Sequence, residues 1–396
     1  MAKPSVLFIN RVYPPVRGAS GRILHDLARS FAADGWSVTV LTTGEKTVQT
    51  MEEGVLVRRI KAPLRMKGAL SYTGVWLRLF FAALRLARRD LVVSLTDPPL
   101  LIVLGRLYAK LKGSRHIHWC QDLYPDLFSA MGVKLPAFLV SLMHRLSRRS
   151  MKSCDGIVVI GRCMAKRIEA LGVEASRLSV IPNWADFELY MEGQRSAPPQ
   201  GPKKNLRRDE NRKFRVLYAG NLGRMHPVKP VLEAASLLSD HPEIEFVFAG
   251  MGPRYEILAR ERERMGLANI KLLPWQPLEN LRALMESADV HLVSMRSQSA
   301  GMLVPCKFYS ALAVQRPVVY IGPEDTEIAA VIKSFGVGMS VPPGKGAELA
   351  QAIIKYRNDG EEWFRAQECA AGAGEVFSPE ASIRTWLKRA EDVVAL

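Results

Sequence analysis

Apolar residues along this chain gather in short runs that are separated by helix-period patterns. The predicted strands of the N-terminal half are 5–10, 37–42, 55–60, 91–96, 116–121, 156–160 and 178–182. Those of the C-terminal half are 215–220, 244–250, 270–274, 289–295, 317–322 and 337–342. Most runs precede a helical pattern, such as the one over 20–34. Strands that alternate with helices over this length predict an α/β fold with parallel, doubly wound sheets.

Both halves begin with the same unit. Ser5–Asn10 leads through the loop YPPVRGASGR into a helix, and Arg215–Gly220 leads through NLGRMHPVK into another. A buried strand, a glycine-containing turn and a helix form the half-unit of nucleotide-binding α/β folds. We therefore expect two facing Rossmann-like domains with a cleft between them, an arrangement suited to joining two substrates.

Chain length and one stretch without apolar periodicity predict the domain boundaries. A chain of 396 residues exceeds what one hydrophobic core usually supports. Residues 191–213 are rich in Pro, Gly and charge, which is typical of a linker. The prediction is one domain over 1–190, a second over 214–378, and a C-terminal helix over 379–396 that is a candidate to cross back to the first domain.

Composition excludes several classes of protein. The N-terminus enters a strand directly, without the pattern of a signal peptide, and no window is apolar enough for a transmembrane helix. The 5 cysteines are scattered and never in C-x-x-C spacing, so neither a zinc site nor a disulfide framework is indicated. We expect reduced thiols and a cytoplasmic protein.

Positive charge is concentrated in the first half. Residues 1–200 contain 29 Lys/Arg and 15 Asp/Glu, a net charge of +14, whereas the remainder has 26 and 24, a net charge of +2. This asymmetry indicates an anionic partner for the first half, either lipid or nucleic acid. No nucleic-acid-binding signature is present, so the sequence favours an anionic membrane surface.

Residues 67–89 are amphipathic, and two interpretations stay open. Trp76, Phe80 and Leu84 form one stripe, and Arg78, Arg85 and Arg89 the opposite one. Such a helix can lie in a membrane interface, or it can pack its apolar stripe on a sheet with a solvated basic face. Residues 134–152 repeat the pattern.

Two segments of the second half suit a phosphorylated ligand. Backbone amides at Gly220, Asn221 and Gly223 can approach phosphate, and Arg224 and Lys229 supply fixed charge. The alternative is an ordinary turn with surface cations. The loop before the helix that ends near residue 313 has free N–H groups for a second phosphate, and an exposed lysine is again the alternative. The residues of interest there are Met302, Leu303, Val304, Lys307 and Ser310.

The first half has polar residues where parallel strands end. Asp122 and Asp126 follow the strand that contains His118, and either carboxylate can orient or deprotonate an acceptor hydroxyl. His118 lies on a buried strand, where a core role is the alternative. Asp97 ends the preceding strand. The loop of Gly18, Ala19, Ser20 and Gly21 is the expected cap of the cleft, with a plain helix entry N-capped by Ser20 as the alternative.

The order of these motifs resembles that of retaining GT-B glycosyltransferases of family 4, most closely bacterial surface-polysaccharide enzymes of the fucosyl and N-acetylfucosamine type. The matching segments are YPPVRGASGR, TDPPL, HWCQDLYPD, IVVIGRCM, VIPNWAD, YAGNLGR, LVPCKFYSALAVQRPV and GPEDTEIA. The resemblance implies that a nucleotide sugar binds the second domain and the acceptor the first. It also implies that Arg224, Lys229 and Lys307 hold the diphosphate with no metal and no other cofactor.

One departure concerns the donor sugar. Most of family 4 has two glutamates eight residues apart, and the equivalent positions here are Met302 and Ser310. Glu327 is a nearby carboxylate. The expected function is transfer of a sugar, UDP-linked by preference, to a lipid-linked glycan of O-antigen type at the inner face of the cell membrane. A nucleotide-sugar epimerase and a degenerate scaffold without activity are the alternatives.

Overall fold

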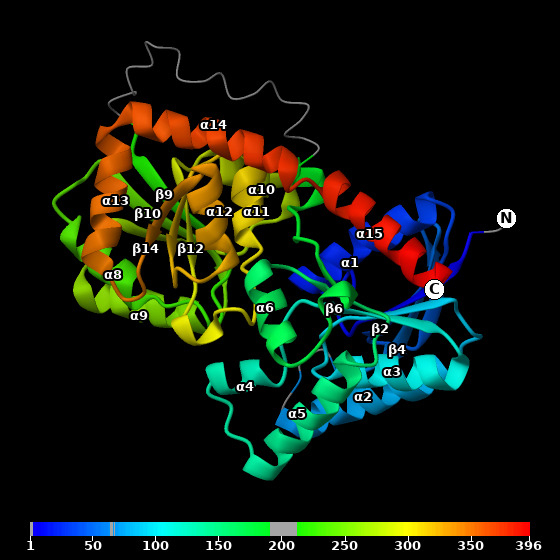
Figure 1. The fold of residues 1–396 in the computed structure, drawn as a ribbon. Helices are drawn as coiled ribbons and strands as arrows, with labels where there is room; N and C mark the ends of the chain where they lie inside the picture. The colour runs from blue at the N-terminus through cyan, green and yellow to red at the C-terminus, as the bar shows by residue number, and fades with distance from the viewer. Residues whose placement is uncertain (1–2, 64–65, 67, 191–211) are drawn as a thin grey trace. The chain divides into compact units, whose positions relative to one another are not determined.

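The computed structural model describes residues 3–63, 66, 68–190 and 212–396 (Figure 1). The chain divides into two compact units. The first contains Met1–Pro182, Gly301–Leu303 and Ser382–Leu396, and the second contains Asn183–Ala300 and Val304–Ala381. The predicted linker, residues 191–213, lies outside the described residues except for its last two positions.

The first unit is built on a sheet of the order β3-β4-β2-β1-β5-β6-β7-β8. Its strands are β1 Ser5–Ile9, β2 Ser37–Gly44, β3 Val48–Glu52, β4 Val55–Lys61, β5 Leu91–Ser94, β6 Arg115–Cys120, β7 Gly156–Val159 and β8 Leu178–Val180. All neighbouring pairs are parallel except β3 with β4, which form an antiparallel hairpin. The parallel, doubly wound sheet is confirmed, and β3 is an edge strand that the apolar pattern did not predict, because exposed and half-buried residues alternate along it.

The helices of the first unit connect these parallel strands. They are α1 Ala19–Ala33, α2 Gly68–Leu84, α3 Leu101–Lys112, α4 Asp126–Ala130, α5 Ala137–Met151 and α6 Arg162–Ala170, with a 3-10 turn at Ala175–Arg177. The helix α3 packs on both α2 and α5, so these three helices are neighbours. The C-terminal helix α15, Pro379–Ala395, also contacts this unit: its Trp386 and the β6 residue Trp119 are fully buried with ring centroids 4.8 Å apart.

The helix α2 turns its aromatic stripe inward. Trp76 and Phe80 pack against the core cluster that contains Val75 and Leu79, and the Trp76 indole N–H donates to the Leu100 carbonyl at 3.2 Å. The helix ends at Leu84, before the predicted boundary at 89. The Arg89 guanidinium donates to Thr39 Oγ1 at 3.1 Å and is half-buried. Of the two interpretations of this stripe, the structure supports packing on the core, because the sheet offers it apolar surface to cover.

The second unit has a six-stranded parallel sheet of the order β11-β10-β9-β12-β13-β14. Its strands are β9 Phe214–Asn221, β10 Ile244–Met251, β11 Ile270–Leu273, β12 Val290–Ser294, β13 Val318–Ile321 and β14 Gly338–Val341. Its helices are α8 Lys229–Leu237, α9 Pro253–Met265, α10 Leu278–Glu286, α11 Lys307–Ala313, α12 Glu327–Phe335, α13 Gly346–Asn358 and α14 Gly360–Val376, with a 3-10 turn at Ser297–Ser299. All six strands coincide with predicted runs to within one residue at each end.

Candidate active site

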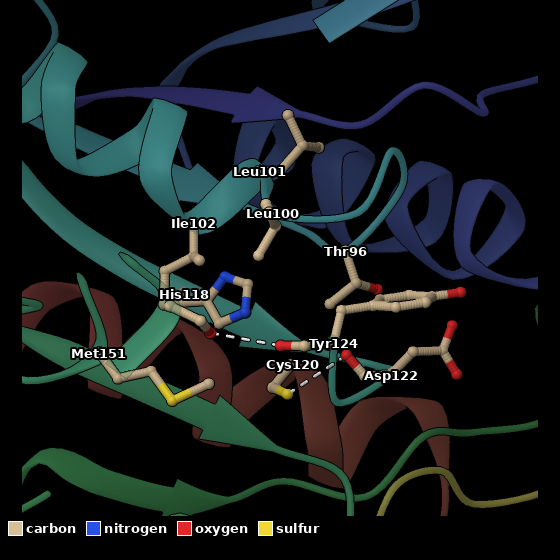
Figure 2. A pocket seen from close by; sticks show the side chains of 10 residues that line it. Thr96, Leu100, Leu101, Ile102, His118, Cys120, Asp122, Tyr124 and Met151 are labelled. Atoms are coloured by element: carbon tan, nitrogen blue, oxygen red, sulfur yellow. Dashed lines mark hydrogen bonds between the residues drawn. The ribbon is translucent and has the colours of Figure 1, made fainter. Parts of the chain in front are cut away.

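A pocket in the first unit lies where β5 and β6 end and α3 begins (Figure 2). The first turn of α3 supplies its apolar wall, and Ser147 and Met151 reach it from α5. Figure 2 shows the Asp122 carboxyl group beside the Tyr124 ring and the His118 imidazole on the side of Ile102. The lining residues are Thr96, Leu100, Leu101, Ile102, His118, Cys120, Asp122, Tyr124, Ser147 and Met151.

Asp122 has the properties of a group that can exchange a proton near neutral pH. Burial, followed by the negative charge of Asp97, raises the pKa of its carboxyl group to about 7. Asp97 itself is held by Arg11, whose guanidinium donates two hydrogen bonds of 2.7 Å to its two oxygens. A carboxylate with a pKa near the working pH can serve as a general base toward an acceptor hydroxyl.

His118 is fixed by its neighbours. Its Nδ1 lies 2.9 Å from the Ser94 carbonyl oxygen and 3.1 Å from Ser94 Oγ, which also contacts His116 Nε2 at 2.8 Å. A carbonyl oxygen only accepts, so Nδ1 carries the proton and Nε2 has the lone pair. Burial lowers the pKa of His118 to about 4, so the ring is neutral at physiological pH. His118 is therefore both a buried core residue and part of the pocket wall.

Asp126 lies outside the pocket-lining set. It begins α4, and Arg167 lies 3.3 Å from one of its carboxylate oxygens. The Gly18–Gly21 loop begins α1, with Gly18 rather than Ser20 at the N-cap position. Side chains at Gly18 and Gly21 would collide with Val12, which explains the glycines by helix packing. Ser20 Oγ accepts a hydrogen bond of 3.4 Å from Asn10.

In the second unit, the last residues of β9 and β10 approach one another so closely that only glycine fits. Gly220 has a φ of +111°, and a Cβ at Gly250 would lie 2.1 Å from the Gly220 carbonyl oxygen. These glycines place the backbone after β9 next to Lys307, whose Nζ donates to the Asn221 carbonyl at 3.0 Å. The Lys307 ammonium also lies 4.8 Å from the centroid of the Tyr218 ring. Burial lowers its pKa to about 8.

The other residues that the sequence predicted to bind the donor are divided between the two units. Arg224 is exposed on the loop after β9, and Lys229 is the exposed first residue of α8. Val304 and Ser310 belong to the second unit, but Met302 belongs to the first, together with Leu303. The Met302 carbonyl accepts a hydrogen bond of 2.8 Å from the Leu123 N–H, directly after Asp122. The helix α11 begins at Lys307, and Cys306 occupies its N-cap position.

Sequence reasoning missed two groups that the structure brings to these sites. Arg11 lies two residues after the end of β1 and pairs with Asp97, and the position of an arginine close to the end of a strand was a usable signal. His226 donates through Nδ1 to the Ser294 carbonyl at 2.7 Å, and burial, followed by the charge of Lys307, lowers its pKa to about 3. Nothing in the sequence separates this histidine from an ordinary loop residue.

Two family models match the two halves of the chain. The model of the glycosyl transferase 4-like domain matches residues 18–184, and the model of glycosyl transferases group 1 matches residues 213–359. The chain belongs to the GT-B glycosyltransferases of family 4.

Individual relatives of this glycosyltransferase are distant. It is 28% identical to the putative colanic acid biosynthesis glycosyl transferase WcaI of Escherichia coli, over 63% of this chain and 60% of that protein. It is 26% identical to the probable glycosyltransferase WbjE of Pseudomonas aeruginosa, over 84% of this chain and 83% of that protein. The match to WcaI thus spans less than two thirds of that protein.

Solved structures share the fold of this glycosyltransferase. Sucrose-phosphate synthase of Thermosynechococcus elongatus has a TM-score of 0.76 at 14% identity, covering 99% of this chain and 100% of that one. HepE of Anabaena in complex with UDP-glucose has a TM-score of 0.70 at 16% identity, covering 98% of this chain and 100% of that one. These likenesses confirm the two-domain α/β architecture.

Proposed function

We propose that this glycosyltransferase moves a sugar from a nucleoside-diphosphate donor, UDP by preference, to a lipid-linked glycan acceptor during synthesis of a cell-surface polysaccharide. One observation carries the proposal: the Lys307 ammonium donates to the carbonyl of Asn221, the last residue of β9, directly before the loop that carries Arg224. Cations in such a place suit the leaving diphosphate of a sugar donor. HepE, which shares the fold, is a structure with UDP-glucose bound, and this supports a nucleotide sugar.

We assign the acceptor to the first unit. We also propose that the transfer retains the anomeric configuration of the donor sugar. The Asp122 carboxyl group, with its pKa of about 7, is the group that would receive the proton of the acceptor hydroxyl. Arg224, Lys229 and Lys307 would neutralise the leaving diphosphate, which is the charge that develops in the transition state. The name of WcaI, a putative colanic acid biosynthesis glycosyl transferase, supports the class of pathway. The proposal also specifies that the transferred sugar is of the fucosyl or N-acetylfucosaminyl type and that the product is an O-antigen.

The test of this function is release of nucleotide from candidate donors in the presence of a lipid extract that contains acceptor. We expect UDP release that depends on the extract and is unchanged by EDTA, because the charge of the diphosphate is met by side chains rather than by a metal. Nuclear magnetic resonance of the product should show the anomeric configuration of the donor. A scaffold would release no nucleotide. An epimerase would change the configuration of the sugar while the sugar stays attached to the nucleotide. Loss of activity in EDTA that is restored by Mg²⁺ would contradict metal independence.

The proposal includes peripheral binding to the inner face of the cell membrane, through the exposed side of α2, α3 and α5. Among the described residues, no helix is both long and apolar enough to cross a bilayer. These three neighbouring helices do expose large apolar side chains, with Phe138 76% exposed. The set is Leu70, Leu77, Phe81, Leu107, Leu111, Phe138, Leu142 and Leu146. Exposed cations lie on the same helices, including Arg78, Lys110, Arg145, Arg148 and Arg149.

The helix α5 connects this surface with the acceptor pocket. Phe138, Leu142 and Leu146 recur at every fourth position and are exposed, whereas Ser147 and Met151 line the pocket that contains Asp122. Apolar residues inserted among lipid tails and cations held at the headgroups are the properties of an interfacial helix. A lipid-linked acceptor held in that interface would have its glycan near the pocket.

Vesicle sedimentation tests the surface. We expect wild type to bind vesicles of anionic lipid at low salt and to be released at high salt, since each Lys or Arg near the surface contributes about 1 kcal/mol. The double variant Arg145→Gln/Arg149→Gln should bind more weakly, and Phe138→Ser should weaken binding in a way that salt does not mimic. Leu237→Ser, which changes an exposed apolar residue of α8 in the second unit, is the matched control. Equal binding of all variants would place the contact elsewhere.

A further inference from the structure

Three arginines meet at one end of the second sheet, where each follows a different strand: Arg224 and Arg296 lie in loops, and Arg254 lies in the first turn of α9. The strands β10, β9 and β12 are neighbours, and Arg254, Arg224 and Arg296 follow them in that order. The Arg254 N–H donates to the Leu222 carbonyl at 3.1 Å, and the Arg296 N–H donates to the Met225 carbonyl at 3.0 Å. Both acceptors flank Arg224 in the chain. The loop that carries Arg224 is therefore tied on both sides to the backbones of the other two arginines.

These guanidinium groups are not neutralised by the protein. Within residues 3–63, 66, 68–190 and 212–396, no hydrogen bond or ion pair engages the side chain of any of the three. Arg254 and Arg296 are half-buried, and Arg224 is exposed. Burial lowers the pKa of Arg254, and the charges of Arg296 and Arg224 act in the same direction. Because arginine stays protonated at physiological pH, the three like charges repel one another until an anion binds among them.

The donor diphosphate does not account for all of this charge. A nucleotide diphosphate joined to a neutral sugar has one negative charge on each of its two phosphate groups, and the three positive charges of Arg224, Lys307 and Lys229 already exceed these two. We propose that Arg254 and Arg296, beside Arg224, bind a second anionic group in addition to the donor diphosphate. Its class is a phosphate or carboxylate, which the planar guanidinium group binds through two parallel hydrogen bonds. The site rests on the proposed function, because Arg224 is assigned there to the donor.

This chemistry has two sources, and two titrations distinguish them. A phosphate group that is not part of the donor is represented by inorganic pyrophosphate added to protein saturated with UDP. An anion on the donor sugar is represented by UDP-glucuronate compared with UDP-glucose. We expect either measurable pyrophosphate binding in the presence of UDP, or at least about tenfold tighter binding of UDP-glucuronate, from one additional charge-assisted pair.

The variant Arg254→Gln/Arg296→Gln should abolish that added binding while UDP affinity changes by less than about threefold. Arg260→Gln is the matched control, because it removes the same charge from an exposed position of α9, the helix that contains Arg254. Melting temperatures verify that each variant is folded. The inference is overturned if UDP binds but neither titration shows added affinity, or if the double variant loses UDP and the added anion to the same extent. Failure of UDP to bind at all would overturn the proposed function and this site with it.

Discussion

Arg224→Ala should reduce the rate of sugar transfer by about 10- to 150-fold while the protein stays folded. The loss corresponds to one hydrogen bond to a charged group, about 1.5–3 kcal/mol, and the charge on the leaving diphosphate grows in the transition state. Stability should be unaffected, because Arg224 is exposed and its loop is held by backbone hydrogen bonds of its neighbours Leu222 and Met225. Initial rates with the donor, together with the melting temperature, measure both quantities.

The control for Arg224→Ala is Arg260→Ala, which removes an exposed arginine of the second unit outside the loops after β9, β10 and β12. It should leave the rate within about twofold, as surface substitutions usually do. UDP affinity should fall in the Arg224 variant and not in the control. A folded Arg224 variant with wild-type activity would contradict the assignment of the diphosphate to this loop.

Asp122→Asn should lower turnover by about 10²–10⁴-fold, the range for loss of a general base, and leave UDP affinity unchanged. The amide cannot accept the proton of the acceptor hydroxyl, and Asp122 belongs to the first unit whereas the Lys307 site belongs to the second. Asp126→Asn is the matched control four residues along, and it should have a smaller effect because the Asp126 carboxylate pairs with Arg167. Loss of UDP affinity in Asp122→Asn would mean that donor and acceptor sites are exchanged.

The pH dependence of activity provides a second readout for Asp122. Its pKa of about 7 means that the carboxyl group is protonated, and inactive as a base, below neutral pH. Wild-type activity should therefore fall about tenfold for each pH unit below 7. Asp97→Asn should move this limb to lower pH, since it removes the negative charge that raises the pKa and leaves the Arg11 cation nearby. A limb that stays at the same pH in Asp97→Asn would assign the titration to another group.

The sequence by itself predicted the α/β class and nearly all of the parallel strands. Fully buried strands appear as continuous apolar runs, and the loops between them contain glycine, so the signal is local. The same reasoning selected Asp122 as a site residue because the ends of parallel strands collect polar residues, and it selected Lys307 because of its place near the start of a helix; both assignments stay predictions. It did not predict β3, whose pairing with β4 satisfies its backbone although its side chains are largely exposed.

Tertiary structure alone decided which side of each helix is buried and which charges meet. Trp76 and Phe80 have the same pattern in α2 as Phe138 and Leu142 have in α5, yet the first pair covers the core and Phe138 and Leu142 are exposed. Amphipathicity reports a stripe, but only the neighbouring elements determine what covers it. The pairing of Arg11 with Asp97 joins residues 86 positions apart. Arg224, Arg254 and Arg296 likewise lie close together because the strands that precede them are neighbours in the sheet. The separation of these residues along the sequence does not reveal that strand order.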